Sequence, residues 1–375
     1  MFDFNKVKTD FEEKCTACGR CVECCPIVSH TELKGHEPEK IMEEILDLFN
    51  HHKIGKLART RIYSCLYCNT CTASCPQGLK PGLSFGIGKK ILSDLGDPVP
   101  EGISSILKTA ETLIKMATPA LKENSETAER LITDIGNTRP DFIPAKTVLF
   151  TSCFGFILSD VLKTAVKIIK RIDPTVKVFG GFDYCCGELQ LIAGEPENAD
   201  RQFAKLINGL NALSPEKVVI LCPTCNMNFD LHRPDTQWSW AFFTDFFADH
   251  LDALGPFKEV NATVTVHDAC HFVRGANPAS DSPRRILSRI PGIKIVEMKN
   301  AKENSMCCGA YAISGAKTPG LSFRDERLKQ ARDTGADILS LYCPGCQMTL
   351  GTETQDSSLK IESCITLLGK SLGII

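Results

Sequence analysis

The stretch KVVILCPTCNMNF fills residues 217–229, and it has a counterpart in DILSLYCPGCQMTL at residues 337–350. Each begins with a short apolar run rich in β-branched residues, which is typical of a buried parallel strand. A Cys-Pro-x-Cys motif follows the run, and a helical pattern begins directly after it. The two stretches therefore predict the same strand–cysteine–helix unit twice in one chain.

The repeat extends outward from these stretches. KTVLFTSC (146–153) matches ATVTVHDAC (262–270), and YCCGE (184–188) matches MCCGA (306–310). Helical patterns such as SDVLKTAVKIIKRI (159–172) separate the strands. Each unit reads as strand, helix, strand, Cys-Cys-Gly, helix, strand, helix, which predicts a small parallel α/β sheet in each repeat.

A cysteine follows four of the predicted strands, namely Cys153, Cys222, Cys270 and Cys343. In open parallel sheets, ligands bind outside the carboxyl ends of the strands, so we expect one site at that edge of each repeat. The aromatic stretch WSWAFFTDFFADHL (238–251) is expected to be a core helix. A further apolar helix is expected over IESCITLLGKSLG (361–373), with Cys364 as a core residue.

A shorter repeat lies near the N-terminus, where CTACGRCVECCP (15–26) and CLYCNTCTASCP (65–76) are offset by 50 residues. The residues between them have helical spacing, which predicts an amphipathic helix or a helix pair. No strand alternation is visible in residues 1–95, so we expect a helical region with its cysteines at helix ends and in loops. The spaced apolar residues are Ile41, Ile45, Leu46, Phe49, Ile54 and Leu57.

The composition excludes several classes of protein. The 375 residues include 43 Lys and Arg against 45 Asp and Glu, so no broad basic surface is expected and no nucleic-acid binding. The first residues lack the apolar core of a signal peptide, and no apolar run approaches the ~18–20 residues of a membrane helix. We therefore expect a cytoplasmic protein whose 20 cysteines serve metal binding or catalysis rather than disulfides.

The N-terminal cysteines have the spacing of iron–sulfur ligands. Both motifs follow C-x2-C-x2-C-x3-C-P, which is typical of bacterial [4Fe-4S] ferredoxins, whereas zinc normally takes two separated C-x2-C pairs. Because the fourth cysteine of such a motif usually binds the other cluster, we predict crossed ligand sets. One set is Cys15, Cys18, Cys21 and Cys75, and the other is Cys65, Cys68, Cys71 and Cys25.

Each C-terminal repeat holds five cysteines, more than a cubane cluster or a tetrahedral zinc requires. Adjacent cysteines rarely both bind one compact metal, which favours a larger and more open cluster. Gly187 and Gly309 permit close approach of the backbone and begin a helix whose dipole favours an anion. The first array is Cys153, Cys185, Cys186, Cys222 and Cys225, and the second is Cys270, Cys307, Cys308, Cys343 and Cys346.

This pattern resembles the CCG domain of the heterodisulfide reductase family. Two such domains behind a two-cluster ferredoxin domain resemble a fusion of the C-type and B-type subunits, as in the D-type subunit. The last gap of the second array has 34 residues where the family has 35 or 36, but all five cysteines remain. The resemblance implies that each array binds a noncubane [4Fe-4S] cluster, which gives four clusters in total. It also implies that a disulfide is cleaved between the two noncubane clusters.

The resemblance covers nearly the whole chain and implies an α+β multidomain fold. It predicts a helical ferredoxin domain and two α/β CCG domains. Between them, the local sequence pattern predicts a helical linker with amphipathic helices around 103–117 and 121–135. The predicted boundaries are 1–95 for the ferredoxin domain, 96–145 for the linker, and 146–258 and 259–375 for the CCG domains.

No sequence signature of a nucleotide, flavin or haem site is present, so electrons are expected to come from a partner. The resemblance implies that the chain is one component of a larger redox complex. Its donor is then a flavoprotein similar to the family's A-type subunit, or a b-type membrane cytochrome that holds the chain at the inner face of the membrane.

The segment HDACHFVRG resembles the family's sequence around the first cysteine of the second array. His271, next to Cys270, is a candidate proton donor to a leaving thiolate, and its alternative role is a hydrogen bond that tunes a cluster. Arg274 is a candidate for binding an anionic substrate group or stabilising cluster charge. His267 is expected to be structural.

Two functions compete at this point. The first is reduction of a disulfide or a similar thiol-derived acceptor, which both complete five-cysteine arrays favour. The second is electron transfer alone, either between a flavoprotein dehydrogenase and quinone or within a large anaerobic redox complex. A zinc scaffold without redox activity leaves the spacing of the four arrays unexplained.

Overall fold

The computed structural model describes residues 3–105, 108, 112, 144–155, 158–275, 281–310, 319–351 and 359–375. The chain divides into two compact units, which are described separately. The first comprises residues 1–109, 187–201 and 306–326, and the second comprises 110–186, 202–305 and 327–375. Apart from α7 (Glu101–Ser104), the helices predicted around 103–117 and 121–135 lie outside the described residues. The boundaries predicted between the four segments stay a prediction.

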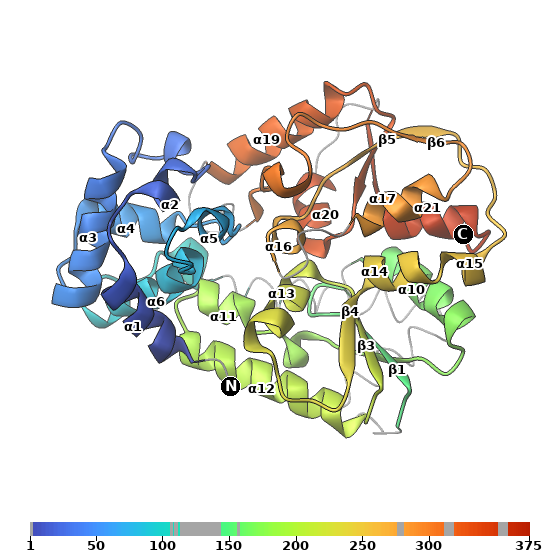
Figure 1. Ribbon diagram of the computed structural model, residues 1–375, viewed down its shortest axis with the longest axis horizontal. Coiled ribbons are helices and arrows are strands. Elements are labelled where there is room, and N and C mark those ends of the chain that lie inside the picture. The colour runs from blue at the N-terminus through green and yellow to red at the C-terminus, as the bar shows by residue number, and fades with distance from the viewer. Residues whose placement is uncertain are drawn as a thin grey trace. The chain divides into compact units, whose positions relative to one another are not determined.

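The N-terminal part of the first unit is helical, as predicted (Figure 1). The apolar pattern between the cysteine motifs gives a helix pair, α3 (Pro38–His51) and α4 (Lys56–Tyr63). Helix α3 buries the face that carries Ile41, Ile45 and Phe49, and the residue that caps its C-terminus, His52, has the left-handed conformation. The other helices of this unit include α1 (Phe4–Lys14), α2 (Arg20–Glu23), α5 (Thr70–Ser74), α6 (Pro81–Asp94), α7 and α11 (Glu188–Ile192).

The two ferredoxin motifs repeat in backbone conformation as well as in sequence. Ala17 and Tyr67 occupy equivalent positions, and both have a φ of 52°. Gly19 and Asn69 also correspond, with φ values of 73° and 59°, and each directly precedes a short helix. In each motif, these left-handed residues reverse the direction of the backbone between consecutive cysteines. The reversal brings successive thiols toward a common centre.

The second unit contains two four-stranded sheets, and every strand pair in them is parallel. Figure 1 labels β1, β3 and β4 of the first sheet and β5 and β6 of the second. The strand orders are β2-β1-β3-β4 and β6-β5-β7-β8. The first sheet consists of β1 (Thr147–Phe150), β2 (Lys177–Phe179), β3 (Lys217–Ile220) and β4 (Ser239–Phe242). The second consists of β5 (Ala262–Val266), β6 (Ile293–Ile295), β7 (Ile338–Leu341) and β8 (Lys360–Ser363). The predicted fold class, with a helical ferredoxin domain and two parallel α/β repeats, is confirmed.

Cysteines follow the two central strands of each sheet, as predicted. Cys153 and Cys222 come after the neighbouring strands β1 and β3, while Cys270 and Cys343 come after β5 and β7. Because neighbouring parallel strands end at the same edge, the fold places these cysteines of each repeat at one edge of its sheet.

The helices of the repeats match the predicted alternation, and α10 (Ser159–Ile172) has the predicted bounds. Further helices are α12 (Pro196–Ala212), α13 (Pro223–His232), α14 (Phe243–Asp249), α15 (Leu251–Leu254), α16 (Cys270–Val273), α17 (Ser282–Ser288), α19 (Pro319–Arg332), α20 (Pro344–Gly351) and α21 (Cys364–Ser371).

The prediction of uninterrupted helices over 238–251 and 361–373 was wrong, because each stretch begins with an edge strand. Strand β4 precedes α14, and β8 precedes α21. Both strands are short and only half-buried, so they lack the continuous apolar run that identifies a central strand. Cys364 is a core residue, as predicted, with 1% of its surface exposed.

Within the described part of the chain, none of the helices combines the length and the apolar composition needed to cross a membrane.

Candidate iron–sulfur centres

The first predicted ligand set surrounds one cavity in the first unit. Cys15, Cys18, Cys21 and Cys75 all line it, together with apolar side chains that include Phe11, Met42 and Leu79. Three of the four thiols come from the first motif and the fourth from the second. The structure thus brings together the four cysteines that the crossed arrangement requires.

The second predicted set also lies together. Cys25 is electrostatically coupled to Cys65 and Cys68, and Cys71 is coupled to all three of these cysteines. Burial raises the pKa of the Cys25 thiol to about 11 and the pKa of Cys71 well above its usual range. The Cys21 thiol in the first set reaches a pKa of about 12 for the same reason. Without a metal these thiols are protonated at neutral pH, so binding a metal there must release protons.

A buried arginine accompanies both thiol sets. Arg61 lies on α4 with 1% of its surface exposed, and its guanidinium lies 4.5 Å from the centroid of the Phe85 ring. Among the residues that the structure describes, none forms a hydrogen bond with its Nε or Nη1 atom. Burial alone lowers the pKa of Arg61, but Cys25, Cys65 and Cys71 outweigh it and hold the pKa above the usual value. A buried cation without its own anion fits a site that holds an anionic cluster.

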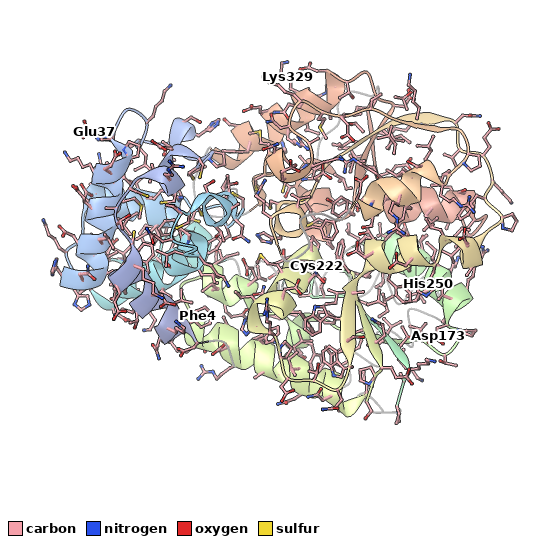
Figure 2. All side chains as sticks on the ribbon, viewed as in Figure 1. Phe4, Glu37, Asp173, Cys222, His250 and Lys329 are labelled. Atoms are coloured by element: carbon pink, nitrogen blue, oxygen red, sulfur yellow. The ribbon has the colours of Figure 1, made fainter. Side chains whose placement is uncertain are left out.

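The first CCG array is assembled within the second unit. Cys185 Sγ lies 3.7 Å from Cys153 Sγ, and Asn228 Nδ2 donates to Cys186 Sγ at 3.6 Å. Cys186 and Cys225 pack in the same hydrophobic core cluster. Four of these five cysteines are buried, and Cys222, labelled in Figure 2 and directly preceding α13, is half-buried.

The pKa values in this array differ according to hydrogen bonding. The hydrogen bond with Cys185, together with burial, raises the pKa of the Cys153 thiol well above its usual range. The pKa of Cys222 is lowered, because Cys225 and the backbone of Thr224 and Cys225 donate hydrogen bonds to it. The half-buried Cys222 therefore ionises more readily than Cys153, Cys186 or Cys225, whose pKa values are all raised.

The cysteines of the second array are described as two groups, one in each unit. Cys270, Cys343 and Cys346 belong to the second unit, while Cys307 and Cys308 belong to the first. Cys307 accepts a hydrogen bond of 3.4 Å from the backbone N–H of Gly309. Gly187 and Gly309 have φ values of 88° and 84°, so both positions after the cysteine pairs favour glycine.

His271 connects the two repeats. Its Nδ1 lies 2.8 Å from Oγ1 of Thr224, which stands between Cys222 and Cys225 of the first array. Both side chains are buried, and helix α13, which carries Thr224, packs against α16, which carries His271. One hydrogen bond therefore joins the Cys-Pro-Thr-Cys loop of the first array to the residue after Cys270 of the second.

The side chain of Arg274 forms hydrogen bonds with two backbone carbonyl groups. Its Nη1 donates to the carbonyl oxygens of Glu303 and Ser305 at 2.9 and 2.8 Å. The side chain thus fixes the segment that precedes Cys307 in the sequence, and its positive charge lies one helical turn after Cys270.

The loop before Cys270 is anchored by a buried ion pair. Asp268 and Arg284 form a bidentate pair with distances of 2.8 and 2.9 Å. Burial by itself raises the pKa of Asp268, but Arg284 outweighs burial and holds the pKa below its usual value. Asp268 Oδ2 also accepts a hydrogen bond of 2.6 Å from the backbone N–H of Lys302.

His267 was expected from the sequence to be structural, and its position beside a cysteine of the second array was not predicted. Its Nε2 lies 3.3 Å from Cys346 Sγ, and Arg327 Nε donates to its Nδ1 at 2.9 Å. Burial and the Arg327 charge hold the pKa of His267 well below its usual value. The repeat alignment already contained a signal, because His267 corresponds to the core residue Phe150 of the first repeat.

An apolar cavity lies beside Cys343 in the second unit. It is lined by side chains from both repeats, including Leu162, Leu221, Phe243, Tyr342 and Ile365. The half-buried thiol of Cys343 in the second array therefore borders a small apolar cavity.

Comparison with known proteins agrees with this organisation. The 4Fe-4S dicluster domain family matches residues 12–79, and the cysteine-rich domain family, CCG, matches residues 147–230 and 264–351. Over 96% of its length the chain is 26% identical to the D-type subunit of the dihydromethanophenazine:CoB–CoM heterodisulfide reductase of Methanosarcina mazei, and the match covers 94% of that relative.

Two further relatives are named as other kinds of oxidoreductase. The B-type subunit of the fumarate reductase (CoM/CoB) of Methanothermobacter marburgensis is 22% identical over 94% of this chain and 71% of the relative. The EtfAB:quinone oxidoreductase of Syntrophomonas wolfei is 20% identical over 89% of this chain and 54% of the relative. With its dicluster domain and two cysteine-rich domains, and with similarity to that D-type subunit over nearly its whole length, the chain is an iron–sulfur electron-transfer subunit of heterodisulfide reductase type.

Proposed function

We propose that the chain reduces a disulfide or a similar thiol-derived acceptor and carries four [4Fe-4S] clusters. In this proposal Cys15, Cys18, Cys21 and Cys75 hold one cubane cluster, and Cys65, Cys68, Cys71 and Cys25 hold the other. One noncubane cluster is held by Cys153, Cys185, Cys186, Cys222 and Cys225. The other is held by Cys270, Cys307, Cys308, Cys343 and Cys346.

The observation that carries the proposal is the hydrogen bond between Thr224 and His271, which joins the two five-cysteine arrays. When bound, the clusters supply one-electron transfers, and cleavage of a disulfide takes two electrons. The half-buried cysteines Cys222, Cys270 and Cys343 give an acceptor access to both arrays.

The proposal includes roles for two residues next to Cys270. His271 donates a proton to the leaving thiolate, held in position by Thr224 at its Nδ1. Arg274 stabilises negative charge at the second array from the position that the carbonyl groups of Glu303 and Ser305 fix.

Replacing His271 with glutamine is expected to slow turnover by about 100-fold without loss of iron, because general acid catalysis typically contributes ~100- to 10,000-fold. Glutamine keeps a hydrogen-bonding group for Thr224 but cannot deliver a proton. The measurement is the steady-state rate against pH, together with the iron content. Wild-type rates across the pH range would assign His271 a structural role.

The proposed function is tested by iron analysis and EPR of protein purified without oxygen. Four clusters correspond to about 16 iron atoms per chain, with an equal amount of acid-labile sulfide. We expect the EPR spectrum of the oxidised protein to change when a thiol or disulfide is added. About 8 iron atoms per chain, with zinc in place of the rest, would contradict the assignment of clusters to the CCG arrays.

The alternative function is electron transfer alone, and the name of one relative favours it. The EtfAB:quinone oxidoreductase is similar to this chain, and its name contains neither a disulfide nor a thiol. About 16 iron atoms with no spectral response to thiols would support this alternative.

The proposed partners follow from the same relatives, two of which are named as subunits of reductases. We infer that the chain works in a larger redox complex and receives electrons from a flavoprotein or from a b-type membrane cytochrome. Copurification with a flavin-containing protein or with a haem-containing protein distinguishes these two donors.

A further inference from the structure

The second CCG repeat buries a polar pair at a position where the first repeat is apolar. His267 aligns with Phe150, three residues before the first cysteine of each array. Arg327 aligns with Leu206, because each lies 16 residues before the Cys-Pro pair of its repeat. Phe150 and Leu206 belong to the same hydrophobic cluster as Cys225. In the second repeat, His267 and Arg327 are 1% and 0% exposed and contact each other near the equivalent cysteine, Cys346.

The hydrogen bonds determine where the proton on His267 is. An arginine side chain carries only N–H donors, so Nδ1 of His267 accepts the 2.9 Å hydrogen bond from Arg327 Nε. A neutral imidazole that accepts at Nδ1 carries its only proton on Nε2. Nε2 lies 3.3 Å from Cys346 Sγ, so this proton points at the sulfur. His267 is thereby a donor to the cysteine and not a metal ligand through Nε2.

Arg327 is itself fixed in place by several neighbours. Its Nη1 donates to the carbonyl oxygen of Asn300 at 2.6 Å and to Gln330 Oε1 at 2.9 Å. Its Nη2 donates to Ser305 Oγ at 3.1 Å. The guanidinium therefore cannot rotate away from His267 without breaking these hydrogen bonds, so it selects one orientation and one tautomer of the imidazole.

We propose that His267, positioned by Arg327, donates an N–H···S hydrogen bond to Cys346 and raises the reduction potential of the cluster in the second array. The inference rests on the proposed assignment of a cluster to that array. A hydrogen bond to a ligand sulfur stabilises the extra negative charge of the reduced cluster, and the buried Arg327 charge acts in the same direction. The second cluster is then the easier of the two noncubane clusters to reduce.

The first array has a weaker counterpart on a different cysteine. Asn228 Nδ2 donates to Cys186 Sγ at 3.6 Å and also donates to the carbonyl oxygen of Thr224 at 3.1 Å. This donor is a neutral amide shared between two acceptors, and the distance to sulfur is longer than the 3.3 Å between His267 and Cys346. The repeats therefore differ in the strength of the hydrogen bond that each array receives.

The test gives the second repeat the residues of the first. The double variant His267→Phe with Arg327→Leu replaces a buried polar pair by an apolar one, a change that folded proteins often tolerate. The midpoint potentials are measured by an EPR-monitored redox titration of the anaerobic full-length chain. We expect the midpoint potential of one cluster in the C-terminal arrays to fall, which corresponds to at least a tenfold change in its redox equilibrium. For one electron this shift equals about 59 mV.

The matched control is Phe150→Leu, which changes the equivalent position of the first repeat and is expected to leave the midpoints unchanged. Unchanged C-terminal midpoints in the double variant, at the full iron content of about 16 atoms per chain, would overturn the inference alone. Absence of C-terminal cluster signals in the wild-type chain would overturn the inference together with the proposed function.

A spectroscopic measurement keeps the inference testable if the double variant does not fold. Pulsed EPR of wild-type protein with 15N-labelled histidine is expected to give a weak nitrogen coupling that disappears in His267→Gln. A strong coupling, as for a directly bound imidazole, or no coupling that depends on His267, would overturn the inference.

Discussion

Replacing Cys307 with alanine is expected to abolish terminal reduction and to leave the signals of the dicluster domain intact. Cys307 is buried, and its sulfur accepts a hydrogen bond from Gly309, as expected for a thiolate ligand. Loss of one ligand from a five-cysteine array is expected to remove one cluster, about 4 of about 16 iron atoms per chain. The measurement combines iron analysis, EPR of the reduced protein and the steady-state rate.

Cys364 provides the matched control for this variant. It is 1% exposed, burial raises its pKa to about 12, and it belongs to none of the cysteine arrays. Cys364→Ala removes one buried thiol and is expected to keep both the iron content and the rate. Full iron content and normal turnover in Cys307→Ala would refute the role of the second array.

Replacing Arg61 with methionine is expected to lower the midpoint potentials of the dicluster domain. Arg61 is a buried cation whose charge acts on Cys21 of one ligand set and on Cys25, Cys65 and Cys71 of the other. Removing it destabilises the more negative, reduced form of each cluster. We expect a shift larger than about 59 mV, the equivalent of a tenfold change in a one-electron equilibrium. A redox titration followed by EPR measures this shift.

Arg59 on the same helix serves as the control. Its side chain is 46% exposed, and its ion pair with Asp97 lies where solvent screens it. Arg59→Met is expected to leave the midpoint potentials of the dicluster domain unchanged. Equal potentials in wild type and Arg61→Met, with full iron in both, would show that the buried charge does not act on the clusters.

Most of the fold follows from local sequence patterns. The continuous apolar runs of β1, β3 and β7 identify central parallel strands, because such strands are covered on both faces. The edge strands β4 and β8 were not predicted from the sequence, because their half-buried residues continue directly into the apolar patterns of α14 and α21. Pairing with a neighbouring strand, and not the local sequence, makes them strands.

In the candidate sites too, some features follow from the local sequence and others depend on the tertiary structure. Spacing predicts the two crossed sets of four thiols, since a short loop brings successive cysteines toward one centre. The sequence by itself therefore determined the number, spacing and order of the cysteine arrays and the parallel strands that present them. Only the tertiary structure brought Arg61 beside thiols from both ferredoxin motifs, Thr224 against His271, and Arg327 behind His267. The physical reason is that charges and hydrogen bonds depend on distance in space, and these partners lie on elements far apart in the chain.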